Sequence, residues 1–492
     1  MSSAFKMADF SFAAPIIFVA LWACVVLLAS AFSTKSSKLG PLTAFGFVIG
    51  LVITGYFWTA LEQPRMSVFS GMLVLDRFSL FLDMIFLLAG LLTSLVAHGY
   101  VEEHGFAESE FYAVIALSVV GMMLMGHAGD FIIVVIGLET MSLGVYSLVA
   151  SWTDKRKSTE AGLKYFVMGA VASGFLVYGI ALLYGATGST RLLVITSRAA
   201  AHIGDPLYII GLFMVFGALA FKVALVPFHM WTPDAYEGAP TPITGFMAAA
   251  VKTAGFGLLV RAVSTIFSGE SFAYGSTGWI NIAWMLSMLT MTVGNVLALR
   301  QTNIKRMLAY SSIAHAGYIM LGVIAIPVLG LDPSAVLLYL LQYAVTTIGA
   351  FGVVAWVGRR DAENTGLEQW AGLGARKPAA ALAMTIFMLS LGGIPPTAGF
   401  FAKLYLFKSA MGHPSLLILV VIAAINSVIS IFYYLKPIVA MYFRDAGGEP
   451  IAEPMRSSSL SVAITLAAII VFLLGMVPGS ALEMAIKSTI GG

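Results

Sequence analysis

Seven ionisable residues stand inside long apolar stretches of this sequence, where charged side chains are rare. They are Asp83, Glu139, Lys164, Lys222, Lys252, His315 and Lys403. If these stretches cross a membrane, each Lys or Asp at a helix centre opposes insertion by about 2.5–3.5 kcal/mol. Such residues are retained where they pair with one another or carry a function, and they commonly mark a path for protons or ions.

The residue types suit proton transfer. Desolvation drives a buried lysine toward its neutral form, and a nearby carboxylate drives it back toward the charged form. Moving one countercharge can therefore change the proton affinity of the lysine across the physiological pH range. We expect Glu139 and Lys222 to form such a modulating pair. The candidate relay groups are Lys164, Lys252 and Lys403, with His315, Ser311, Ser312, Tyr310 and waters bridging the gaps. This path requires no metal and no nucleophile.

Structural roles compete with this interpretation at two positions. Asp83 follows Arg77 by six residues near a helix end, so it could pair or reach the membrane surface there. His315 could be a polar packing residue between helices. Lys222, Lys252 and Lys403 lie deeper, where reaching the membrane surface is strained.

Proline and glycine interrupt two of the apolar segments that carry these lysines. Residues 221–246 read FKVALVPFHMWTPDAYEGAPTPITGF, and residues 389–403 read LSLGGIPPTAGFFAK. Non-helical backbone at membrane depth is tolerated only where it is buried in protein or lines a watery cavity. We therefore predict two discontinuous helices, each with a lysine within about two turns of its break. Kinking for packing alone is the alternative.

The composition indicates a membrane protein whose surface is in contact with lipid. Of 492 residues, 59% are hydrophobic and 10% are charged, with a mean hydropathy of +0.94, whereas soluble domains carry roughly 25% charged residues. The net charge of +3 excludes nucleic acid as a partner. The single cysteine, Cys24, excludes a disulfide framework, a Cys-ligated zinc site and an iron–sulfur cluster in this chain.

Apolar segments of about 20 residues predict the fold. Fourteen of them begin near residues 13, 42, 78, 110, 130, 161, 206, 241, 278, 303, 333, 379, 415 and 458. Their connectors are short, so we expect an all-α polytopic membrane protein in which residues 1–492 form a single membrane domain. Loops on one side carry fourteen Lys and Arg against eight on the other. This bias places both termini on the periplasmic face.

A faint internal repeat is also present. Residues 130–150 can be aligned with 302–322, which places Tyr146 on Tyr318, and Pro227 then falls near Pro395. The sequence thus predicts two inverted five-helix repeats, 110–266 and 278–443, a pattern typical of transporters.

The two interrupted segments resemble those of a known family, the antiporter-like subunits of respiratory complex I. Within this family, the chain is most similar to the N-type subunit of bacterial NADH–quinone oxidoreductase and to mitochondrial subunit 2. Three features carry this similarity: the segment EAGLKYFVMGAVASGFLVYG from Glu160, the motif WTPDAYEGAPTP, and the lysine at Lys403. The resemblance implies proton-transfer roles for Glu139, Lys222, Lys164, Lys252 and Lys403, and a place for His315 on the polar axis between two half-channels.

The resemblance also implies partners. FMN, the iron–sulfur clusters, NADH oxidation and quinone reduction would reside in other subunits, and this chain would bind no cofactor. Its neighbours would be lipid and other membrane-arm subunits, including homologous antiporter-like ones, in the bacterial cytoplasmic membrane. The alternatives are a stand-alone or Mrp-type cation/proton antiporter, which would purify without a quinone-reducing enzyme, and a structural spacer without proton-transfer groups.

Overall fold

The computed structural model describes residues 7–32, 38–105, 110–268, 278–358, 363–445, 454–488 and 490. All fourteen predicted segments are helical there, and eleven helices are long and apolar enough to cross a membrane. Three shorter apolar helices, Phe111–Gly126, Pro206–Lys222 and Pro378–Gly392, account for the other segments. Four of the cations behind the predicted orientation, Lys6, Lys35, Arg359 and Arg360, lie outside the described residues.

The N-terminal part is a helical hairpin followed by a short β-hairpin and a long buried helix. The elements are α1 (Met7–Phe12), α2 (Ala14–Phe32), α3 (Leu39–Ala60), β1 (Arg65–Val68), η2 (Phe69–Gly71), β2 (Leu73–Asp76) and α4 (Arg77–His104). The strands pair antiparallel, with Arg65 opposite Asp76. Asp76 then starts α4 through a capping box with Ser79, which satisfies two of the free groups at the helix end.

The first half of the remaining chain contains one broken helix. Its elements are α5 (Phe111–Gly126), α6 (Phe131–Val149), α7 (Arg156–Thr187), α8 (Leu192–Arg198), η3 (Ala199–His202), α9 (Pro206–Lys222), α10 (Trp231–Gly238), α11 (Thr241–Phe246), η4 (Met247–Val251, a π-helical turn) and α12 (Lys252–Val263). Non-helical residues 223–230 separate α9 from α10, as the prolines predict. A second interruption at Ala239 and Pro240 divides α10 from α11.

The second half repeats this plan. Its elements are α14 (Trp279–Leu299), α15 (Ile304–Leu329), α16 (Ser334–Trp356), η5 (Leu367–Trp370), α17 (Leu373–Arg376), α18 (Pro378–Gly392), α19 (Ala398–Ala410) and α20 (Pro414–Phe443), followed by α21 (Ser458–Met476) and α22 (Gly479–Lys487). Gly393 ends α18 with φ +78°, a left-handed conformation that glycine adopts without strain. The break between α18 and α19 is the second predicted discontinuity.

Matching backbone contacts support the repeat. The amide next to each helix start pairs with a distant strand-like segment: Phe131 N with Thr190 O, Leu192 N with Gly129 O, Ile304 N with Thr365 O, and Leu367 N with Thr302 O. The pairing makes Asp130 equivalent to Asn303, each of which caps its helix. This equivalence differs by one residue from the sequence alignment. The boundaries 110–266 and 278–443 remain a prediction.

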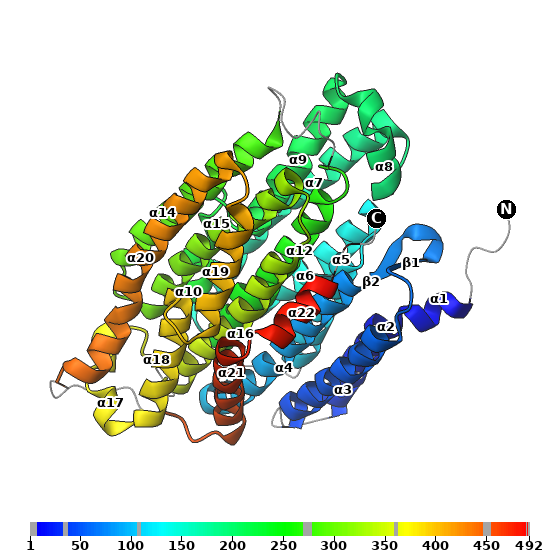
Figure 1. Cartoon of the computed structure of the whole chain (residues 1–492). Coiled ribbons are helices and arrows are strands. Elements are labelled where there is room, and N and C mark those ends of the chain that lie inside the picture. The colour runs from blue at the N-terminus through cyan, green and yellow to red at the C-terminus, as the bar shows by residue number, and fades with distance from the viewer. Residues whose placement is uncertain are drawn as a thin grey trace.

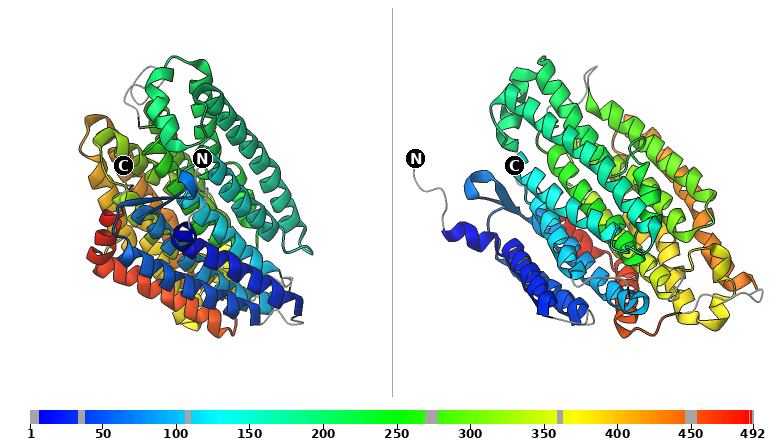
Figure 2. Two further views of the ribbon diagram at one scale, coloured as in Figure 1. Left: turned by 90° about the vertical axis from the view of Figure 1, so that its right-hand side faces the viewer. Right: turned by 180° about the vertical axis from the view of Figure 1, so that it is seen from behind.

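The two halves have opposite orientations. The segment paired with Asp130 leads into α8, and the segment paired with Asn303 leads to η5 and α17, at the other end of the molecule (Figure 1). The first helix, α1, lies near the β-hairpin (Figures 1 and 2).

Four helices form the interior. The span Thr241–Val263, which contains α12, is completely buried, and most of α4, α15 and α16 is buried as well. In contrast, α7 and α20 leave most of their length unburied, and apolar side chains make up much of that surface. The charged side chains on α12 and α15 are therefore held inside protein and away from lipid, as membrane burial requires.

Candidate proton-transfer site

Lys222 ends α9 and points its ammonium group between α6 and α7. The side chain is buried, and Nζ donates a hydrogen bond of 2.7 Å to Oγ of Ser142. The rings of Tyr146 and Tyr165 lie 5.8 and 5.9 Å from the same nitrogen. A cavity of about 10 Å³ beside it is close to the space that one water molecule requires. One hydroxyl and two aromatic faces therefore hold this ammonium group.

The predicted direct pair between Glu139 and Lys222 is not formed. Their charged groups are farther apart than the 4.0 Å limit for an ion pair, although Glu139 acts electrostatically on Lys222. Glu139 lies one turn before Ser142 on α6 and is partly exposed. The carboxylate is thus positioned to influence Lys222 through space.

Lys164 is closer to the surface than the sequence suggested. Its side chain is 50% exposed and forms ion pairs of 2.9 Å with Glu160 and 3.4 Å with Asp234. Asp234 also binds Arg306, at 3.1 Å, beside an open cavity of about 230 Å³ that Lys164 lines. Lys164 is the ninth residue of α7, a 32-residue helix that buries little of its length against the rest of the chain.

Lys252 begins α12 and is bound to α15. Its ammonium group donates to both the carbonyl and the hydroxyl of Ser312, and the hydroxyl of Tyr236 lies 3.5 Å from that serine oxygen. Gly255, one turn later on α12, lies against the aliphatic part of Lys222. The two lysines therefore occupy neighbouring sites along one helix face, as a relay needs.

His315 continues the polar chain along α15. Its Nδ1 lies 2.7 Å from the hydroxyl of Tyr339, and its Nε2 lies 3.0 Å from the hydroxyl of Tyr434. The same Tyr434 hydroxyl bonds to Ser311, the neighbour of Ser312. A chain of groups that can both donate and accept protons thus extends from the Lys252 site to His315.

Lys403 is held at the second helix break. Its ammonium group donates to the carbonyl oxygens of Leu391 (3.0 Å) and Gly392 (3.2 Å) and to the hydroxyl of Ser427 (3.0 Å). The carbonyls are free because the helix ends there. Tyr318, whose ring is 5.3 Å from this nitrogen, also contacts the ring of His315. The break supplies the binding site for the lysine.

Three buried ion pairs were not predicted from the sequence. They are Asp76–Arg261, Asp83–His127 and Lys305–Glu363. Arg261 and Lys305 lie near span boundaries in the sequence, and both are among the loop and helix-end cations that predict the orientation. Their burial depends on partners that are far away along the chain. In the sequence, the one indication that Arg261 and Lys305 are buried is that they lie close to an apolar segment.

Glu363 lies outside the spans, in the segment before η5. It accepts hydrogen bonds from Tyr100, from Thr241 (2.7 Å) and from Lys305 (3.3 Å). Burial raises the pKa of Glu363, but the Lys305 ammonium group and the two hydroxyl donors outweigh it, so the net pKa is lowered. The carboxylate therefore stays ionised and ties this segment to α4, α11 and α15.

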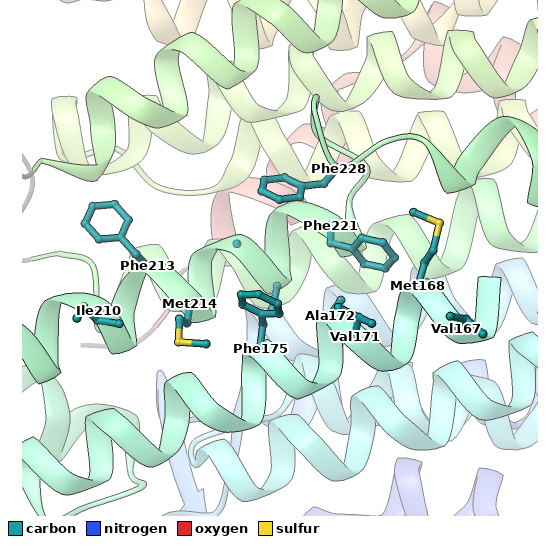
Figure 3. A pocket seen from close by; sticks show the side chains of 12 residues that line it. Val167, Met168, Val171, Ala172, Phe175, Ile210, Phe213, Met214, Phe221 and Phe228 are labelled. Atoms are coloured by element: carbon teal, nitrogen blue, oxygen red, sulfur yellow. The ribbon is translucent and has the colours of Figure 1, made fainter. Parts of the chain in front are cut away.

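An open apolar groove of about 560 Å³ lies between α7 and α9, outside the polar chain. Phe175, Phe221 and Phe228 face it, and polar side chains are absent from its lining (Figure 3). Such a surface suits apolar material and gives no binding group for a proton or cation. Among the described residues, no group of three or more His, Cys, Asp or Glu is arranged to hold a metal ion.

Comparison with known proteins places this geometry in a family. The family described as NADH:quinone oxidoreductase/Mrp antiporter, transmembrane, matches residues 128–430. NADH-quinone oxidoreductase subunit N 1 of Sorangium cellulosum is 44% identical, over 97% of each chain.

Solved structures agree. A chain of respiratory complex I from Thermus thermophilus is 31% identical, with a TM-score of 0.78 over 96% of this chain and all of that one. A chain of the Mrp complex from a Dietzia species shares the fold alone, with 19% identity and a TM-score of 0.81 over 97% of both chains. The chain therefore belongs to the NADH:quinone oxidoreductase/Mrp antiporter transmembrane family, and its full-length relatives are N-type subunits of NADH-quinone oxidoreductase.

Proposed function

We propose that this chain is a proton-translocating membrane-arm subunit of an NADH–quinone oxidoreductase. The observation that carries the proposal is a series of buried polar groups along α15. Lys252 binds Ser312 there, and the hydroxyl of Tyr434 joins Ser311, the next residue, to His315. A spacer would gain stability from apolar residues at these positions, because burying polar and charged groups is costly.

In this proposal Lys222 and Lys252 bind protons in turn. A change in the charge or position of Glu139 alters the electrostatic free energy of the Lys222 ammonium group, and Ser142 keeps that group in place. When Lys222 releases its proton toward Lys252, repulsion favours onward transfer through the serine and tyrosine hydroxyls to His315 and Lys403. Lys164 and its acidic partners form the entrance at the end of α7.

The redox chemistry resides in partner subunits, which carry FMN and the iron–sulfur clusters in this proposal. The neighbours are membrane-arm subunits, including homologous antiporter-like ones. Full-length similarity to N-type subunits and to a complex I chain supports this assembly. We further propose a bacterial cytoplasmic membrane with both termini on the periplasmic side, because Lys and Arg are fewer on that side.

The test is NADH-driven proton pumping with quinone as acceptor, in sealed vesicles that carry Lys222→Ala or Glu139→Ala. We expect a loss of coupled turnover with the complex still assembled. Normal pumping by both variants would refute the proposal and favour a spacer.

Purification distinguishes the competing function, that of a self-sufficient or Mrp-type antiporter, from the proposed one. Affinity capture of this chain should recover NADH–quinone oxidoreductase activity with it. Recovery of a sodium/proton exchanger without that activity would reverse the assignment.

A further inference from the structure

Two acid–base pairs meet where α4, α5 and α12 pack together, apart from the lysine chain. The first joins Asp76 at the start of α4 to Arg261 on α12, with two hydrogen bonds of 3.0 Å. The second joins Asp83 on α4 to His127, the residue that ends α5, with 2.8 Å between Oδ2 and Nε2. All four side chains are almost completely buried.

Close packing brings the second pair next to α12. Leu82, the neighbour of Asp83, touches the backbone at Gly257, where an added methyl group would lie 2.6 Å from its Cδ1. The same leucine lies against Gly126, the neighbour of His127. Lys252 precedes Gly257 by five residues, which is about 7.5 Å along the helix axis. The turn of α4 that carries Asp83 is thus packed against α12 between Lys252 and Arg261.

The two pairs differ in how far their hydrogen bonds are satisfied. Asp76 uses both oxygens on Arg261 and also accepts from the Ser79 amide, and Arg261 donates further bonds to the carbonyl of Gly126. This pair is complete and electrically neutral, as expected of a structural ion pair. In contrast, Oδ1 of Asp83 is buried and has no hydrogen-bond partner among the described residues. An incomplete buried carboxyl is costly unless it has a further role.

We propose that Asp83 and His127 form an additional proton-binding site for pumping, beside α12 on the β-hairpin side of the lysine chain. The inference rests on the proposed function. Oδ1 of Asp83, the oxygen without a hydrogen-bond partner, is the position for the additional proton. His127 shares the charge of the Asp83 carboxyl group through its hydrogen bond to Oδ2. Asp83 lies in the second turn of α4, which begins directly after β2 of the β-hairpin.

The charges around the Asp83–His127 pair belong to the neighbouring ion pair and to β1. His127 and Asp76 are the charged groups that act on Asp83, and Arg261 of α12 neutralises Asp76. Arg65 of β1 acts on both members of that neighbouring pair. These charges are held in ion pairs or lie on the neighbouring β-hairpin.

The experiment uses the assembled complex in sealed vesicles and compares Asp83→Asn, His127→Gln and Asp83→Glu. The matched control is Asp130→Asn, since Asp130 is also a buried aspartate but uses both oxygens to hold Ile132 and Thr190, a capping role that asparagine retains. Lys222→Ala is the reference for loss of proton transfer. NADH-driven pumping, its pH profile and the thermal midpoint of the complex are measured for each.

The proposal requires Asp83→Asn and His127→Gln to lower pumping severalfold and to change the pH profile, with thermal midpoints close to that of Asp130→Asn. Asp83→Glu, which restores a titratable group, should recover part of the rate. If Asp83→Asn does not assemble, the pH profiles of Asp83→Glu and His127→Gln decide instead.

Pumping by the Asp83 and His127 variants equal to the control, while Lys222→Ala is defective, would show that the pair is structural and leave the proposed function intact. Normal pumping by Lys222→Ala as well would overturn both.

Discussion

Replacing Ser142 by alanine should weaken the hold on the Lys222 ammonium group without removing the lysine. Ser142 is the hydrogen-bond acceptor of Nζ, at 2.7 Å, and the other contacts within the described residues are aromatic rings more than 5 Å away. A hydrogen bond to a charged group contributes about 1.5–3 kcal/mol. The protonated form of Lys222 loses this amount in the variant, and the neutral form loses much less.

This loss of free energy from the protonated form of Lys222 corresponds to a shift in the pH dependence of proton pumping. Each pH unit corresponds to about 1.36 kcal/mol, so the alkaline limit of proton pumping should move toward acid by about 1–2 units. The sign follows because a less stable ammonium group releases its proton at lower pH. The assay is NADH-driven pumping by sealed vesicles between about pH 6 and 10, normalised to the amount of assembled complex.

Ser147→Ala is the matched control. Ser147 lies on the same helix, and its hydroxyl bonds only to the carbonyl of Gly144 in its own helix. The control should retain the profile of the unmodified protein. If the Ser142 variant pumps with an unchanged alkaline limit, then protonation of Lys222 does not limit pumping, and the reasoning that places this lysine in the transfer chain is wrong.

Three further outcomes are expected. Asp76→Asn should destabilise the complex by about 3–5 kcal/mol, because it leaves the buried Arg261 guanidinium group unpaired, whereas the double variant with Arg261→Met should lose less stability. Thermal midpoints in detergent measure the stability of both variants. Equal losses in the single and double variants would contradict the assignment of this ion pair. Glu363→Gln should destabilise at neutral pH, because Lys305 loses its countercharge. Since the folded-state pKa of Glu363 is lowered, that stabilisation is present above the unfolded-state pKa near 4.5 and fades as pH falls through the folded value, so the difference between variant and parent should shrink as the pH falls below 4.5. Lys403→Gln should lower pumping and leave assembly unchanged; full pumping would remove Lys403 from the chain.

The arrangement of the fold was accessible from the sequence to a large extent. Hydropathy located the helical segments because the membrane requires about 20 apolar residues for each crossing. Proline and glycine located both helix breaks, at 223–230 and after Gly392, because these residues act on the backbone locally. The burial of Lys222, Lys252 and Lys403 also followed from their depth in the spans.

The partners of these residues could not be predicted. Hydropathy gives the depth of a residue but not the direction in which its side chain points, and the helices that meet are remote in sequence. Lys222 binds Ser142, 80 residues away, in place of Glu139.

Arg261, near the end of a span, is buried against Asp76, 185 residues away. Lys164 is half exposed because α7 buries little of its length against the other helices. The sequence alone determined which groups could carry protons and at what depth. The packing of the helices decided which of those groups touch, because that packing depends on contacts between distant segments.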